Sequence, residues 1–156
     1  MSSAAISDDR QRASIPGILA NELVAASAAH SSDRVIIAGT DQLEFLITLL
    51  RRGFANVDCM SASDGPPLHA GEADIVIAPS VQGEADLLHI LQRFGCTLRP
   101  RGVLVLHEAS PVHDERRMRQ FFFSSGFAAV ERVPSVNGFG HHWCAYKQNA
   151  AAAQAA

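Results

Sequence analysis

Three short, almost purely apolar runs constrain the fold of this chain most strongly. Each is too short for a helix and is bounded by turn-forming residues, as is typical of strands buried on both faces. The runs are VIIA (35–38), DIVIA (74–78) and VLVLH (103–107). Segments with helical spacing of apolar residues follow each run. This alternation predicts a parallel sheet with right-handed crossovers.

Four helices and three further strands complete the prediction. Helices are expected over Ile15–His30, Asp41–Arg52, Gly83–Phe94 and Asp114–Ser124, and Gly53 is well suited to end the second. Further strands are expected over Val57–Met60, Ala128–Val133 and His142–Lys147.

The last two strands have only PSVNGFG between them, so they are expected to form an antiparallel hairpin. The fold class is therefore α/β: a three-layer α/β/α sandwich with a mostly parallel, doubly wound sheet and a C-terminal antiparallel hairpin. One domain is expected over residues 15–147. The polar N-terminus (1–14) and the alanine-rich tail (148–156) are expected to lie outside it as flexible ends.

Net charge and apolar run lengths restrict the possible partners, and the cysteine content restricts the cellular compartment. The net charge is −3 and the pI about 6.1, so we expect neither nucleic acid nor an anionic membrane surface as a partner, since both require a basic face. No apolar run approaches the roughly 18 residues that span a bilayer. Cys59, Cys96 and Cys144 are widely spaced and odd in number, which argues against a disulfide framework and favours a reducing cytoplasm.

Three segments together resemble the S-adenosylmethionine-dependent methyltransferase superfamily with a Rossmann-like fold. ADIVIAPSVQGEADLLHILQRFGCTLRPRGVLVLHE (73–108) is similar to that family's fourth strand, following helix and fifth strand. GFAAVERVPSVNGFGHHWCAYK (126–147) is similar to its closing hairpin, and RVIIAGTDQLEFLITLLRRGF (34–54) to its opening strand, turn and helix. The resemblance covers most of the chain and implies a sheet in the order 3-2-1-4-5-7-6, with strand 7 antiparallel.

The resemblance also implies where S-adenosylmethionine would lie: over the carboxyl ends of strands 1, 2 and 4. It assigns cofactor contacts to the Gly39–Thr40–Asp41 turn, to Asp58 or Ser61 at the ribose, to Asp64 at the adenine, and to Pro79 directly after the second apolar run.

Three departures from the family pattern affect this site. The acid that usually precedes the glycine turn falls on Ile37, and the second glycine falls on Asp41, whose charge would repel the cofactor's carboxylate. The helix that follows still offers free N–H groups. The ribose-binding acid falls on Met60. Only three residues separate Met60 from Asp64, so we expect the sheet to lack its third strand.

Histidine and cysteine residues suggest two further sites, each with a plainer alternative. His107 ends a strand at the edge where such sheets carry active sites, so it is a weak candidate for a general base; alternatively it is a strand-end residue in solvent. His142 and Cys144 share one face of a strand and would begin a zinc site with His107 or His113, or else are ordinary strand residues. No metal is expected.

The remaining motifs favour structural interpretations. Cys59 is expected to be a small buried hydrophobe, and Ser80 lacks the G-x-S-x-G elbow of a hydrolase. Phe121 and Phe122 are expected to pack on the sheet, whereas one of the three phenylalanines at 121–123 borders solvent or a partner. The arginines of this region are too few for a nucleic-acid stripe.

Two hypotheses for function follow. The first is a methyltransferase-like fold with a degenerate cofactor site that acts as a binding or regulatory module, as a homo-oligomer or with a protein partner. The alternative is an active small-molecule S-adenosylmethionine-dependent methyltransferase with an atypical cofactor loop.

Overall fold

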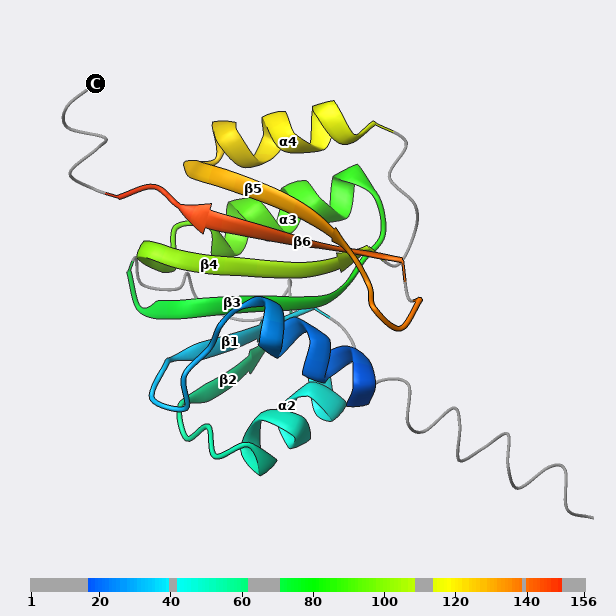
Figure 1. The fold of residues 1–156 in the computed structure, drawn as a ribbon. Coiled ribbons are helices and arrows are strands. Elements are labelled where there is room, and N and C mark those ends of the chain that lie inside the picture. Colours follow the sequence, from blue (N-terminus) through cyan, green and yellow to red (C-terminus); the bar gives the residue numbers. More distant parts are fainter. Residues whose placement is uncertain (1–16, 40–41, 62–70, 109–113, 139, 150–156) are drawn as a thin grey trace, which may run out of the picture.

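A computed structural model describes residues 17–39, 42–61, 71–108, 114–138 and 140–149 (Figure 1). The chain begins in this description with a helix over 17–26, called the amino-terminal helix below. The elements that follow are β1 (Val35–Ala38), α2 (Gln42–Arg51), β2 (Val57–Met60), β3 (Ala73–Val81), α3 (Glu84–Phe94), β4 (Leu98–Glu108), α4 (Glu115–Ser124), β5 (Phe127–Pro134) and β6 (His141–Lys147).

All the strands belong to one six-stranded sheet in the order β2-β1-β3-β4-β6-β5. Strands β2, β1, β3 and β4 are parallel, and β6 lies antiparallel between β4 and β5. This is the order implied by the resemblance with the third strand removed, which leaves β2 at the edge of the described sheet. The predicted α/β class and antiparallel hairpin are confirmed.

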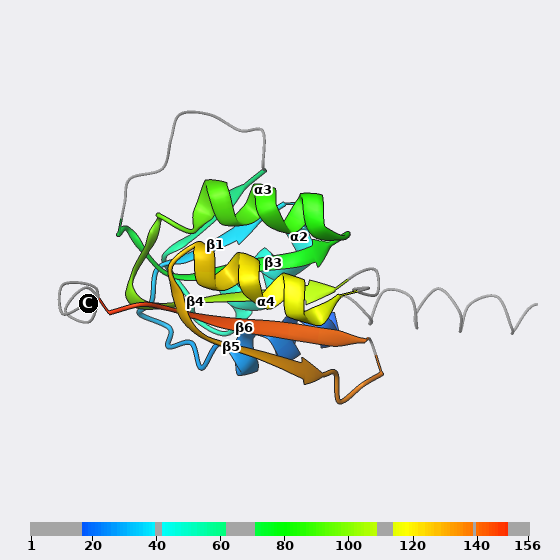
Figure 2. The same ribbon diagram turned by 90° about the horizontal axis from the view of Figure 1, so that it is seen from above.

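Helices cover both faces of this sheet and give the predicted three layers (Figures 1 and 2). Alternate residues of each strand point to opposite faces, so the strands contribute to two separate cores. Ile36 and Ala38 of β1 join the core beneath α3 and α4, whereas Val35 and Ile37 join the core beneath α2 and the amino-terminal helix. The apolar runs in the sequence therefore correspond to strands buried on both faces.

Several boundaries differ from the prediction. Strand β4 begins at Leu98 rather than Val103, because the LRPRG segment joins the strand as a bulge opposite Asp74. The Arg99 guanidinium fixes this bulge by bonding the Asp74 carboxylate (2.9 Å) and the Gly71 carbonyl (3.1 Å). The amino-terminal helix ends at residue 26 rather than His30, and Ala28 follows with a left-handed φ of 51°.

The phenylalanines of α4 behave as predicted. Phe122 is fully buried and stacks on Trp143, with ring centroids 5.5 Å apart. Phe121 is partly buried against the same core, and Phe123 is the one that borders solvent, with half of its surface exposed.

In the described part of the chain, no helix has the length and apolar character required to cross a membrane.

The bulge in β4 yields a stability prediction. Arg101 has a φ of 66°, a left-handed conformation that glycine adopts far more readily than arginine. Replacing Arg101 with Gly is expected to raise the free energy of unfolding by about 0.5–1 kcal/mol, measured by urea denaturation. The neighbouring Gly102→Ala variant is the control and should lose stability, because a Cβ there would lie 2.8 Å from the Arg99 carbonyl oxygen. Destabilisation by Arg101→Gly would contradict the assignment of strain to Arg101.

Candidate functional site

The turn after β1, which the resemblance assigns to the cofactor, begins with a glycine in a left-handed conformation. Gly39 has a φ of 96°, and its N–H donates to the Met60 carbonyl at the end of β2 (3.0 Å). No atom lies within 4 Å of a Cβ built on Gly39, so the glycine is required by backbone conformation and not by close packing. Thr40 and Asp41 lie outside the described residues.

The backbone carbonyl groups of this turn already have a hydrogen-bond donor in the protein itself. The Gln42 side-chain amide donates to the Gly39 carbonyl (2.7 Å) and approaches the Ile37 carbonyl (3.3 Å). Because Gln42 is the first residue of α2, its side chain folds back over the start of its own helix. The turn is therefore stabilised by the protein itself.

The residue at the end of β2 that the resemblance assigns to the ribose is Met60, which is not an acid. Met60 is partly buried and packs against the core beneath α3 and α4. Asp58, two positions earlier, forms an ion pair with Arg34 (3.1 Å). Arg34 immediately precedes β1, so the Asp58 carboxylate is directed to the amino end of the strands, away from Gly39. Ser61 lies just beyond β2, and Asp64 lies outside the described residues.

Two more predicted residues belong to strands. Pro79 is buried within β3 at the irregularity in its pairing with β4, a kind of position at which strands tolerate proline. Ser80 follows in the same strand. Cys59 is exposed and not buried as expected, because β2 is an edge strand. Partial burial and the Asp58 charge raise the pKa of Cys59, which makes it a poor nucleophile.

A buried chain of titratable groups lies at the carboxyl ends of the strands. His107 of β4 and His142 of β6 stand opposite each other, with their Nδ1 atoms 3.2 Å apart. The His142 Nε2 atom lies 2.8 Å from the Glu22 carboxylate of the amino-terminal helix. Both rings are buried, so the interpretation of His107 as a residue in solvent is wrong.

Glu22 is the anchor of this chain and was not identified from the sequence. Its carboxylate also accepts hydrogen bonds from the Ser135 hydroxyl (2.6 Å) and from the Asn137 side-chain amide (2.7 Å) and backbone N–H (3.1 Å). The helix is thereby joined to the β5–β6 turn. The only signal in the sequence is an acid among the apolar positions of a predicted helix.

The arrangement of hydrogen bonds determines where a proton can reside. With both rings neutral, His142 Nε2–H donates to Glu22, so His142 Nδ1 accepts the Nδ1 proton of His107. A further proton would enter at His107 Nε2, where the Glu22 carboxylate favours the charge and burial opposes it. The group can therefore accept a proton near the end of β4, although less readily than a histidine in water.

Burial and the bonds within the chain shift two pKa values. Burial, and then the His142 ring, lower the pKa of His107 below its usual 6.5, against the opposing effects of a hydrogen bond with the His141 backbone and of two carboxylates. Burial would raise the pKa of Glu22, but the hydrogen bonds with Ser135, His142 and Asn137 outweigh it and hold that pKa below 4.5.

The predicted zinc pair does share one face of β6, but both members have other partners. The His142 ring lies at hydrogen-bond distance from Glu22 and His107, as described above. The Cys144 sulfur lies 3.9 Å from the Ala26 carbonyl of the amino-terminal helix, and burial, followed by the Glu131 charge, raises the Cys144 pKa to about 11. Within the described ranges, no three or more His, Cys, Asp or Glu residues are grouped so that they could hold a metal ion. His113 lies outside those ranges.

A second buried polar cluster occupies the opposite face of the same strand ends. The Glu108 carboxylate accepts two hydrogen bonds from the Arg132 guanidinium, each 3.0 Å long, and a third from the Trp143 indole N–H. The Glu108 side chain is only 4% exposed. Arg119 and Arg132 also lie over the Trp143 ring. This cluster joins β4, β5 and β6 beside α4.

Comparisons with known proteins find similar solved structures but no similar sequence family. No protein-family model matches the sequence, and no curated protein matches it either. Solved structures do match. The 1,6-didemethyltoxoflavin-N1-methyltransferase of Burkholderia thailandensis, bound to 1,6-didemethyltoxoflavin and S-adenosylhomocysteine, is 14% identical with a TM-score of 0.58, covering 92% of this chain and 84% of that one.

Two further structures give the same result. A protein of Methanococcus maripaludis, provisionally named an S-adenosyl-L-methionine-dependent methyltransferase, is 12% identical with a TM-score of 0.62, covering 88% of this chain and 86% of that one. Geranyl diphosphate methyltransferase, in complex with SAM, is 11% identical with a TM-score of 0.58 and 85% coverage of both chains.

The chain has the fold of S-adenosylmethionine-dependent methyltransferases. At these identities the likeness concerns the fold and not the activity. In this fold, the Gly39 turn and the ends of β2 and β4 lie along one edge of the sheet. The positions that the resemblance assigns to the cofactor and the Glu22–His142–His107 chain therefore share that edge.

The shifted pKa values predict how stability depends on pH. His107 has a lower pKa folded than unfolded, so its contribution is complete above about pH 6.5 and is lost as the pH falls toward the folded pKa. Glu22 adds a second loss below pH 4.5. Urea denaturation is expected to show falling stability from pH 7 to pH 5. A His107→Gln variant should lack this first fall; a wild-type slope in the variant would contradict the assignment.

The second cluster yields a mutational prediction. Removing the carboxylate by Glu108→Ala leaves the Arg132 guanidinium and the Trp143 N–H without their buried acceptor, and is expected to cost about 3 kcal/mol of unfolding free energy. Glu131→Ala is the matched control, because the Glu131 side chain is exposed on the neighbouring strand, and should cost less than about 0.5 kcal/mol. Similar losses in the two variants would refute a structural role for this cluster.

Proposed function

We propose that this chain uses the methyltransferase fold as a binding or regulatory module and does not transfer methyl groups from S-adenosylmethionine. The observation that carries the proposal is the end of β2, where Met60 packs against the core at the ribose position and the Asp58 carboxylate is paired with Arg34 toward the other edge. The chain keeps the frame of the cofactor site without its acidic ribose contact.

The energetic consequence is large. A carboxylate that accepts two ribose hydroxyls makes charged hydrogen bonds of about 1.5–3 kcal/mol each, whereas a thioether sulfur is a weak acceptor. Losing both bonds weakens binding by about two orders of magnitude or more. The Arg34–Asp58 pair is exposed and weak, but breaking it would not help, since Asp58 is directed away from the Gly39 edge.

The turn itself supports the same proposal. The Gln42 amide already satisfies the Gly39 carbonyl, so an incoming ligand does not supply a missing bond there. A negatively charged Asp41 in the adjoining sequence disfavours the cofactor's carboxylate.

One observation favours the alternative, an active small-molecule methyltransferase. The Glu22–His142–His107 chain provides a proton acceptor at the end of β4, where a methyl-accepting hydroxyl or amine would have to lose its proton. In that reaction His107 would take the proton, His142 and Glu22 would share the charge, and methyl transfer would depend mainly on alignment. S-adenosylmethionine would be the cofactor.

Calorimetric titration with S-adenosylmethionine and S-adenosylhomocysteine distinguishes the two. We expect no heat from either ligand at about 1 mM, because the ribose acceptor is missing. The Met60→Asp, Asp41→Gly double variant restores the acid and the small residue at the two altered positions, and should gain measurable affinity for S-adenosylhomocysteine. Met60→Leu, which changes shape but not charge, is the control and should gain none.

Micromolar binding by the wild-type protein would overturn the proposal. In that case a methyl-transfer assay with hydroxyl and amine acceptors would test the alternative, and His107→Gln should abolish turnover while leaving cofactor binding unchanged.

A further inference from the structure

Among the described residues, no helix covers one end of the sheet on the face that carries the amino-terminal helix. Register places three rows of side chains on this face, running from β4 across β6 to β5. The rows are Val103–Tyr146–Ala129, Val105–Cys144–Glu131 and His107–His142–Val133. Figures 1 and 2 show the amino-terminal helix in front of the inner strands and no described helix in front of β5.

Burial decreases along each row. Val105 and Cys144 are buried, whereas Glu131 in the same row is exposed. His107 and His142 are buried, whereas Val133 is 40% exposed. The open face, defined here as Ala129, Glu131, Val133 and Tyr146, is therefore a continuation of the core surface beyond the reach of the helix that covers it.

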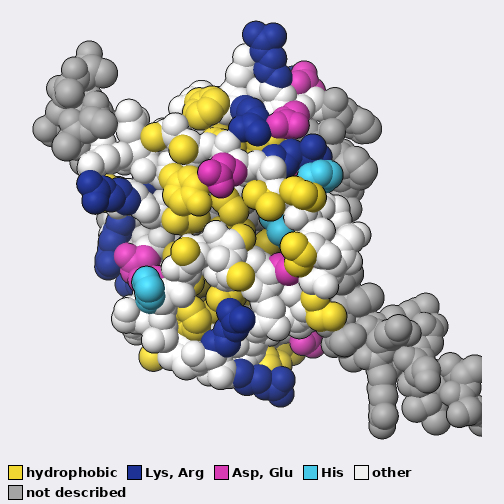
Figure 3. Space-filling view, viewed as in Figure 1, with side chains coloured by type: hydrophobic (Ala, Val, Ile, Leu, Met, Phe, Trp, Pro, Cys, Tyr) yellow, Lys and Arg dark blue, Asp and Glu magenta, His cyan; other side chains and the backbone are white. Residues whose placement is uncertain are grey.

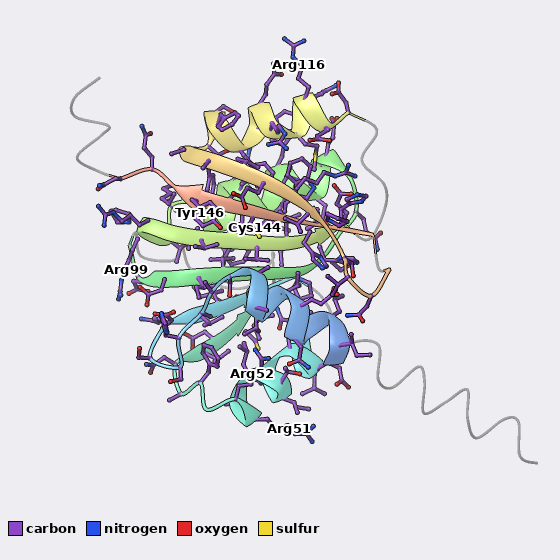
Figure 4. All side chains as sticks on the ribbon, viewed as in Figure 1. Arg51, Arg52, Arg99, Arg116, Cys144 and Tyr146 are labelled. Atoms are coloured by element: carbon purple, nitrogen blue, oxygen red, sulfur yellow. The ribbon has the colours of Figure 1, made fainter. Side chains whose placement is uncertain are left out.

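The open face is apolar around a single acid. Figure 3 shows hydrophobic side chains gathered over β5 and β6 with an acidic side chain among them, and Figure 4 shows Cys144 and Tyr146 along β6 at this place. Glu131 lies close enough to contribute to the raised pKa values of both Cys144 and Tyr146. No hydrogen bond or ion pair joins the Glu131 carboxylate to another described residue, although each of the other carboxylates discussed for the strand ends has a cationic or hydrogen-bonding partner.

The dimensions of the open face match one helix. The amino-terminal helix contacts β6, through Glu22 on His142 and Ala26 on Cys144. Packed helices lie about 8–10 Å apart, which is about two strand spacings of about 4.8 Å, so a helix packed beside the amino-terminal helix would lie along the β5 edge of the sheet. At the carboxyl-end side of this position stands Val136, 89% exposed, at a turn that Ser135 and Asn137 fix to Glu22.

We propose that the open face binds an amphipathic helix of a protein partner, with its apolar side on Val133 and Tyr146 and a lysine or arginine paired with Glu131. The partner helix would complete the front layer of the sandwich. A second copy of the chain placed by a two-fold axis at the centre of this face would bring two Glu131 carboxylates together, which disfavours that occupant. The proposal holds whether or not the cofactor site is active.

The test uses two synthetic amphipathic peptides of about five helical turns, one with leucine and lysine faces and one with leucine and glutamate faces. Fluorescence anisotropy with the full chain is expected to show binding of the lysine peptide and at least tenfold weaker binding of the glutamate peptide. Glu131→Lys should reverse this preference. Val133→Asp should weaken binding of the lysine peptide at least tenfold.

The matched control is Phe123→Asp, since Phe123 is a half-exposed apolar residue on α4, on the other face of the sheet. It should leave peptide binding unchanged, and thermal denaturation of each variant verifies that it is folded. Equal binding of both peptides, no binding of either, or equal loss with Phe123→Asp would overturn the proposal. So would a wild-type dimer in sedimentation equilibrium that Val133→Asp abolishes, because the face would then belong to a second copy.

Discussion

The antiparallel insertion of β6 between β4 and β5 is the constraint on which the rest of this structure depends. Because β6 runs against β4, its first residues face the last residues of β4. His142 is thereby placed opposite His107, and Trp143 reaches Glu108 from the other side of the sheet. Strand alternation separates these contacts onto two faces. One pairing thus creates two buried polar clusters, each of which ties the hairpin to a helix layer.

The two halves of the sheet differ in the hydrogen bonds and ion pairs that their polar side chains make. On the β4–β6 side, the buried His107, His142 and Glu108 side chains have partners at hydrogen-bond distance, as is required of polar groups removed from water. On the β1–β2 side, the edge strand is short and exposed, and its acid is paired with Arg34 at the far edge. The buried polar contacts at the ends of β4 and β6 therefore lie away from the turn that the resemblance assigns to the cofactor.

Periodicity predicted the elements well because burial on both faces leaves a strong signal in a sequence. The runs at 35–38 and 74–78 have almost no polar residues, and the structure buries them in two cores. The predicted element boundaries were wrong where the local geometry departs from a regular strand. An example is the start of β4, where a bulge that contains Arg99 belongs to the strand. Cys59 was assigned incorrectly because a strand pattern alone does not distinguish an edge from the centre of a sheet.

Polar contacts between residues far apart in the chain could not be predicted from the sequence. His142 and Cys144 were correctly placed on one face, but Glu22, which bonds His142, lies 120 residues away and carries no local motif. Arg132 and Glu108 likewise meet only because the hairpin folds back on β4. The cofactor departures at Ile37, Asp41 and Met60 depended on the family resemblance; the structure adds the Gln42 bonds and the direction of Asp58.

We propose that the methyltransferase fold persists here without a working cofactor site, and the backbone amide of Gly39 reports on that site most directly. A heteronuclear NMR titration of the labelled protein with S-adenosylhomocysteine follows that amide together with the amides at the end of β2. We expect the resonances of these amides to stay unshifted at about 1 mM ligand, a concentration that detects even weak affinities. A saturable shift of Gly39 and Met60 together would contradict it, because the ligand would then occupy the carboxyl edge of β1 and β2.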